Sequence, residues 1–89
     1  MKHSAGVKQM QHDDCVDARG LACPLPLLKA RLALNGMTAG QVLKVMATDA
    51  GSQRDIRSFC QLAGHELLHD EQTADAVFVY FIRKQAGTA

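Results

Sequence analysis

Residues 14–36 read DCVDARGLACPLPLLKARLALNG, a segment that changes from an alternating to a helical pattern around a glycine and two prolines. Val16 and Ala18 alternate with polar residues, which predicts a short strand over residues 14–18. Arg19 and Gly20 break this strand, because glycine readily adopts the conformations that a turn needs. The segment is therefore expected to run from a strand, through a turn, into a helix.

The second half of the segment predicts an amphipathic helix. Its apolar stripe is traced by three leucines and broadened by two more: Leu25, Leu28 and Leu32, with Leu27 and Leu34. The helix is expected to end at Asn35-Gly36, since glycine commonly follows the last helical turn. We expect the leucine stripe to face the core.

The remaining sequence predicts one more helix and three more strands. The expected elements are a strand over Val42–Ala47, a helix from a Ser52-x-x-Asp55 capping box to Gly64, and strands over His65–Glu71 and Ala76–Lys84. Their order is βαβαββ. We predict a two-layer α/β sandwich, in which a mixed four-stranded sheet has a parallel first pair, an antiparallel final hairpin and both helices on one face.

The final strand is apolar on both of its alternating faces. Residues 76–82 read AVFVYFI, although a two-layer sandwich covers only one face of its sheet. Two interpretations remain open for the other face. Part of it meets a partner, or the strand is central and is shielded by flanking side chains.

Size and composition indicate one small domain. The chain has 89 residues and a formal net charge of +1. We predict a flexible tail over residues 1–13, the domain over 14–85 and a flexible end over 86–89. No apolar run approaches the roughly 18 residues of a membrane span, and the first residues lack the apolar core of a secretory signal. These features favour a cytoplasmic location and argue against membrane binding.

Cys23 is the candidate functional residue. We predict that it is the N-cap of the first helix, with Pro24 and Pro26 at the first and third helical positions, where a missing N–H has no intrahelical acceptor. The Leu25 N–H would then donate to the sulfur, and the helix terminus would lower the thiol pKa toward neutrality, helped by a cation such as Arg19. The alternative is a small residue that merely starts the helix.

The other two cysteines lack such a setting. Cys60 lies on the expected core stripe of the second helix, and Cys15 lies on the first strand without an activating neighbour. Three cysteines form neither an even disulfide framework nor a Cys-x-x-Cys pair. We predict no metal site and no resident cofactor.

Two loops are expected to meet at one rim of the sheet. Residues 19–23 and 49–54 each follow a parallel strand, and such loops share the edge at the carboxyl ends of the strands. Asp49 and Arg54 are therefore candidate docking residues, although a loop cap and a solvated helix residue explain them equally well. His65 is expected at the opposite edge, which disfavours a Cys/His pair.

These residues resemble the TusA/SirA family of sulfur carrier proteins. The resemblance lies in Asp17-x-x-Gly20-x-x-Cys23-Pro24-x-Pro26, then in Asp49, Arg54-Asp55-Ile56, Phe59-Cys60 and Gly64-His65-x-Leu67. It spans about residues 14–84. The position of Cys-Pro-x-Pro after a strand, with the second motif downstream, makes the combination fairly specific.

The resemblance implies a fold like the C-terminal domain of translation initiation factor 3 and a transient persulfide on Cys23. A cysteine desulfurase or a rhodanese-like protein would donate the sulfur, and an acceptor protein would receive it, for tRNA 2-thiouridine synthesis or other sulfur trafficking. Arg31 and Asp49 match positions implicated in donor docking, and Leu25 stands where some tRNA-thiolation members carry an acidic residue. Gly20 and the two prolines would support the site. Such a chain is a sulfurtransferase-type carrier rather than an independent enzyme.

Two other classes of function compete with the carrier. A regulatory protein-binding module without sulfur chemistry would use the apolar last strand and would tolerate Cys23→Ser. An RNA-binding module would need clustered basic and aromatic side chains, whereas the chain has one Tyr, three Phe and no Trp. We therefore expect no strong direct nucleic-acid binding.

Overall fold

A computed structural model describes residues 11–86. Its elements, in chain order, are β1 (Asp14–Ala18), α1 (Leu25–Asn35), β2 (Val42–Ala47), α2 (Gly51–Ala63), β3 (Glu66–Gln72) and β4 (Phe78–Arg83). The predicted order βαβαββ is confirmed. The predicted tail and C-terminal end lie largely outside the described residues, although the Asp13 N–H donates to the Val42 carbonyl at 2.8 Å.

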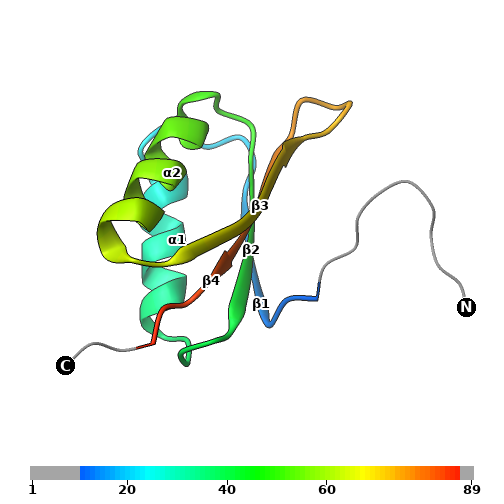
Figure 1. The fold of residues 1–89 in the computed structure, drawn as a ribbon. Helices are drawn as coiled ribbons and strands as arrows, with labels where there is room; N and C mark the ends of the chain where they lie inside the picture. The colour runs from blue at the N-terminus through cyan, green and yellow to red at the C-terminus, as the bar shows by residue number, and fades with distance from the viewer. Residues whose placement is uncertain (1–10, 87–89) are drawn as a thin grey trace, which may run out of the picture.

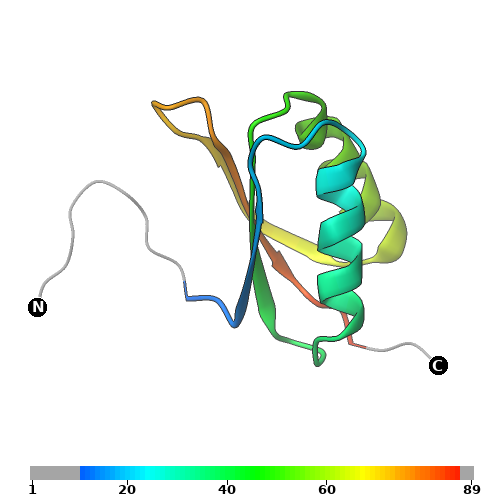
Figure 2. The same cartoon turned by 180° about the vertical axis from the view of Figure 1, so that it is seen from behind.

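The sheet has the strand order β1-β2-β4-β3. β1 and β2 are parallel, whereas β4 runs antiparallel to both β2 and β3. Figures 1 and 2 show both helices on one face of this sheet. The predicted two-layer sandwich with a mixed sheet is therefore confirmed.

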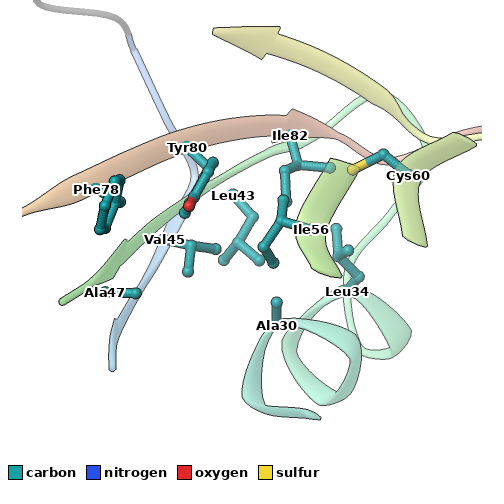
Figure 3. Close-up of a cluster of buried hydrophobic side chains, with 10 residues drawn as sticks. All are labelled: Ala30, Leu34, Leu43, Val45, Ala47, Ile56, Cys60, Phe78, Tyr80 and Ile82. Carbon is teal, nitrogen blue, oxygen red and sulfur yellow. The ribbon is translucent and has the colours of Figure 1, made fainter. Parts of the chain in front are cut away.

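The core lies between the helices and the covered face of the sheet (Figure 3). Alternate residues of β2 and β4 point into it, because successive side chains of a strand face opposite sides. The largest fully buried side chains of this layer include Leu43 and Val45 from β2, Tyr80 and Ile82 from β4, and Ile56 from α2. The two central strands thus supply the buried sheet residues of this core.

The predicted leucine stripe of α1 is buried only in part: Leu34 is 1% exposed and Leu27 packs against the core, as expected. Leu25, Leu28 and Leu32, in contrast, are exposed by 45%, 43% and 72%, and the helix also buries Pro26 and Ala30, which lie outside the predicted stripe. The reason is that α1 is apolar around most of its circumference, so periodicity does not select one face. The three exposed leucines form a stripe that we call the leucine face.

β4 is an interior strand, and neighbouring side chains cover the apolar face that points away from the helices. Phe81 points away from the helices yet is only 5% exposed. The rings of His12 and His69 lie 6.0 and 6.2 Å from its ring centroid, and the Lys44 ammonium lies over it at 5.9 Å. Flanking side chains therefore shield this strand, as one of the two interpretations proposed.

α2 ends at Gly64 as predicted but begins differently. Gly64 has φ 83°, a left-handed conformation that favours glycine, and its N–H donates to the Cys60 carbonyl at 2.9 Å. At the other end, Ala50 is the N-cap and no side chain caps the helix, so the predicted capping box is wrong. Ser52 instead lies buried within the helix, and its hydroxyl is 2.7 Å from the Tyr80 hydroxyl.

Candidate functional site

Two loops meet at one edge of the sheet, as predicted. Figures 1 and 2 show the β1–α1 loop and the β2–α2 loop side by side above the strands. The Gly20 N–H donates to the Thr48 Oγ1 at 2.9 Å and joins the two loops. Gly20 has φ 83°, a left-handed conformation that favours glycine. A Cβ at this position would meet no atom within 4 Å, so the backbone conformation and not space is the reason for glycine here.

Cys23 precedes α1 by two residues rather than capping it. The N-cap is Pro24, whose carbonyl accepts the Leu28 N–H at 3.1 Å, and Pro26 occupies the second helical position. The Leu25 N–H donates to the Ala22 carbonyl at 2.9 Å, so it does not serve the sulfur. The predicted cap is therefore wrong by one residue.

The Cys23 side chain is exposed and is held by α2. Its Sγ makes a short hydrogen bond with the Asp55 Oδ2, across 32 positions of the sequence. Gly51 permits this approach, because a Cβ there would lie 3.4 Å from the Cys23 Sγ and 2.9 Å from the Asp49 Oδ2. A larger residue at the start of α2 would push the loops apart.

The carboxylates around the sulfur raise the pKa of the Cys23 thiol above its ordinary value. The hydrogen bond to Asp55 is the main cause, with removal of water and the charges of Asp55 and Asp49 adding to it, while Arg54 acts in the opposite direction. The predicted lowering is wrong, because an anion beside the thiol disfavours the thiolate. The resting site thus holds a protonated thiol.

Arg19 does not act on the thiol. Its guanidinium pairs with Asp17 through Nε at 2.8 Å and Nη2 at 2.7 Å, and this pairing lowers the pKa of Asp17 to about 2. Both side chains are half exposed at the end of β1. The pair stiffens the entrance to the β1–α1 loop and leaves Arg54 as the cation that acts on the thiol.

The remaining predicted docking residues lie on α1, in the β2–α2 loop and on α2. Leu25 is exposed in the first turn of α1, and Arg31 lines a groove between α1 and α2 with a volume of about 440 Å³. Asp55 lines the same groove. The Asp49 Oδ2 accepts the Gly51 N–H at 3.1 Å, so this carboxylate caps its loop as well as facing the rim.

The other thiols and His65 take no part in this site. Cys60 is 3% exposed, and burial raises its pKa to about 11, so it is an inert core residue. Cys15 is exposed on β1. The His65 Nδ1 accepts the Gln85 N–H at 3.0 Å, at the opposite edge of the sheet, and burial lowers its pKa. Within residues 11–86, no group of three His, Cys, Asp or Glu side chains could hold a metal ion.

Sequence reasoning missed Asp55 and Gly51 as site residues. The sequence around Asp55 matches a capping box, and Gly51 belongs to no recognised motif. A signal was available, because both lie in the loop and first turns expected at the thiol's rim. Asp55 follows Gly51 by four residues, which places both on the same side of α2.

The fold and the site define a small α/β protein that presents a thiol beside a carboxylate at the start of a helix. A family model described as sulfurtransferase TusA matches residues 15–84. The chain belongs to the TusA family. None of the helices in the described part of the chain is long and apolar enough to cross a membrane.

Individual relatives match this chain over nearly their whole length. A protein named sulfur carrier protein TusA from Pseudomonas entomophila is 45% identical over 84% of this chain and 92% of its own length. Another of the same name from Allochromatium vinosum is 44% identical over 81% of this chain and 93% of its length. A crystal structure of a SirA-like protein from Desulfitobacterium hafniense has a TM-score of 0.73 at 23% identity, covering 82% of this chain and 99% of that one, which shows a shared fold.

Proposed function

We propose that this protein carries sulfur as a persulfide on Cys23. It would accept the sulfur from a cysteine desulfurase or a rhodanese-like donor in the cytoplasm and pass it to an acceptor protein, for tRNA 2-thiouridine synthesis or other sulfur trafficking. The observation that carries the proposal is the exposed Cys23 thiol, held at the rim where both crossover loops meet. The names of its relatives point to the same chemistry.

The surface near Cys23 has the features of a protein-docking site, which a sulfur carrier needs. The leucine face begins at Leu25, two residues beyond Cys23 in the sequence. Arg31 and Arg54 add positive charge, and Asp49 adds negative charge at the rim. Apolar anchors surrounded by charged groups are typical of protein-docking surfaces. We infer that donor and acceptor dock on this surface in turn, and that the thiol needs no deep substrate pocket.

Intact-mass analysis after incubation with a cysteine desulfurase and cysteine tests the carrier function. Wild type should gain one sulfur atom per chain, and Cys23→Ser should gain none. Cys15→Ser and Cys60→Ser are matched controls that remove the other two thiols one at a time and should keep the gain. Labelling that persists in Cys23→Ser would refute the assignment.

The docking surface has its own test. Leu28→Gln combined with Leu32→Gln should slow sulfur uptake from the desulfurase by about tenfold or more, since burying a leucine contributes about 1.5–3 kcal/mol. Uptake by the same variant from a small persulfide such as glutathione persulfide should not change, because that donor needs no docking surface. Equal slowing with both donors would contradict the docking role.

The leucine face also favours a second candidate, a regulatory protein-binding module without sulfur chemistry. Three exposed leucines on one helix would serve such a module equally well. The two functions differ at Cys23. In the protein-binding module Cys23→Ser is silent and Leu32→Gln is not, whereas the carrier depends on both.

A further inference from the structure

The carboxylate of Asp55 stands between the thiol and the groove. One of its oxygens hydrogen bonds with the Cys23 Sγ, and its side chain also lines the groove between α1 and α2. It is partly buried, so it faces less solvent than a free surface carboxylate. No other described side chain hydrogen bonds with the sulfur.

We propose that Asp55 is a catalytic residue that takes the proton of the Cys23 thiol during sulfur uptake and delivers it to the departing sulfur of the donor. This inference rests on the proposed carrier function. It assigns Asp55 two roles in one step, as a base toward Cys23 and as an acid toward the donor. The geometry supports it, because the carboxylate contacts the reacting atom directly and also lines the open groove between α1 and α2.

The chemistry of the step balances. The Cys23 Sγ bonds to the terminal sulfur of the donor persulfide while its proton passes to Asp55. The S–S bond of the donor breaks, its electron pair stays on the inner donor sulfur, and Asp55 returns the proton to that sulfur. One S–S bond forms as another breaks, so the step needs no external oxidant or reductant. Asp55 ends the step ionised, as it began.

A proton acceptor is needed because the resting thiol is poorly ionised. The thiolate is the nucleophile in sulfur exchange, yet the surrounding carboxylates raise the pKa of Cys23. The same step requires a good leaving group, and a sulfur leaves more readily once it can be protonated. A carboxylate that first receives the proton and then gives it up meets both requirements. Before a donor arrives, it keeps the thiol protonated and less prone to oxidation.

The other titratable groups nearby are less suited to this role. The Asp49 Oδ2 already accepts the Gly51 N–H, and Asp49 acts on the thiol only through its charge. Arg54 is a cation and cannot accept a proton. His65 is bonded at the opposite edge, and His69 pairs with Glu71 on the sheet face away from the helices.

The test compares two reactions of Cys23 at pH 7 in a Cys15→Ser background. Alkylation by iodoacetamide releases iodide, which needs no proton, so its rate depends on the thiolate and its nucleophilicity but not on a proton donor. Sulfur uptake from glutathione persulfide instead releases the glutathione thiolate, which does need a proton. Asp55→Asn should alkylate at least as fast as the parent, because it loses the main group that raises the thiol pKa. It should take up sulfur at least tenfold more slowly, since positioned acid–base groups typically contribute 10²–10⁴-fold.

Two control variants complete the design. Asp55→Glu keeps a carboxylate and should recover part of the uptake rate. Glu66→Gln removes a carboxylate that pairs with Arg83 at the far edge of the sheet, and should change neither rate.

Two results would overturn the role of Asp55. One is uptake by Asp55→Asn at or above the parent rate, and the other is a fall of both rates together, which indicates a structural effect. Failure of the carrier function itself looks different: the parent protein would then take up no sulfur, or Cys23→Ser would take it up.

Discussion

Removing the hydroxyl of Tyr80 is expected to loosen the first turns of α2. The Tyr80 and Ser52 hydroxyls are 2.7 Å apart, and the two residues are 0% and 1% exposed. Their hydrogen bond ties the start of α2 to the central strand β4. Gly51 and Asp55 lie on either side of Ser52 and both approach Cys23, so this bond also holds the site in place.

The size of the effect follows from burial. Tyr80→Phe leaves the Ser52 hydroxyl buried without its partner, which costs about 1–3 kcal/mol of unfolding free energy. For a domain of this size, each kcal/mol lowers Tm by roughly 4–8 °C. The double variant Ser52→Ala, Tyr80→Phe removes both polar groups, and replacing both partners by apolar groups is often nearly neutral. Its free energy of unfolding should therefore fall by less than the two single changes added together.

Urea denaturation of the four proteins of this double-mutant cycle measures the coupling directly. We expect a coupling free energy of about 1 kcal/mol or more between the two positions. Additive single changes, or a Tyr80→Phe protein within about 0.5 kcal/mol of wild type, would refute the claim that this hydrogen bond anchors α2.

Three further predictions concern ionisable groups. Because burial lowers the pKa of His65 below its ordinary value of about 6.5, the unfolded chain binds more protons, so the free energy of unfolding should fall as pH drops below about 6.5. Urea titrations should show a flatter pH profile for His65→Gln, and an unchanged profile would contradict this. Arg19→Gln should raise the pKa of Asp17 from about 2 toward its ordinary value in an NMR titration, and an unmoved value would argue against the ion pair. Cys60, with its pKa raised to about 11, should be alkylated only on unfolding, far more slowly than Cys15 in the native protein.

Most of the fold could be predicted from local pattern. Gly20 and Gly40 interrupt the chain near β1 and β2, and Gly64 marks the end of α2, so the predicted element boundaries agree with the structure within about two residues. The buried face of α1 could not be predicted in the same way. Both Leu25-x-x-Leu28 and Pro26-x-x-x-Ala30 give apolar helical spacings, and only packing against the sheet decides between them.

The site was half predictable for a related reason. Cys23 and its rim follow from chain topology, since loops after parallel strands share one edge. The contact between Cys23 and Asp55 spans 32 residues and depends on how closely the two loops approach, which Gly51 controls. Local pattern placed Asp55 in a capping box, because the capping motif and this site use the same carboxylate near a helix start.

The wrong sign of the predicted pKa shift at Cys23 has a simple physical origin. A helix N-terminus carries roughly half a positive charge, shared among several N–H groups, and its first free donor here serves the Ala22 carbonyl. Asp55 brings a full negative charge into hydrogen-bond contact with the sulfur, so the carboxylate outweighs the helix. A thiol held in this way gives little thiolate by itself, and its reactivity depends on where its proton can go. The arrangement favours transfer to a docked donor or acceptor over reaction with any passing electrophile, which is the selectivity that a carrier requires.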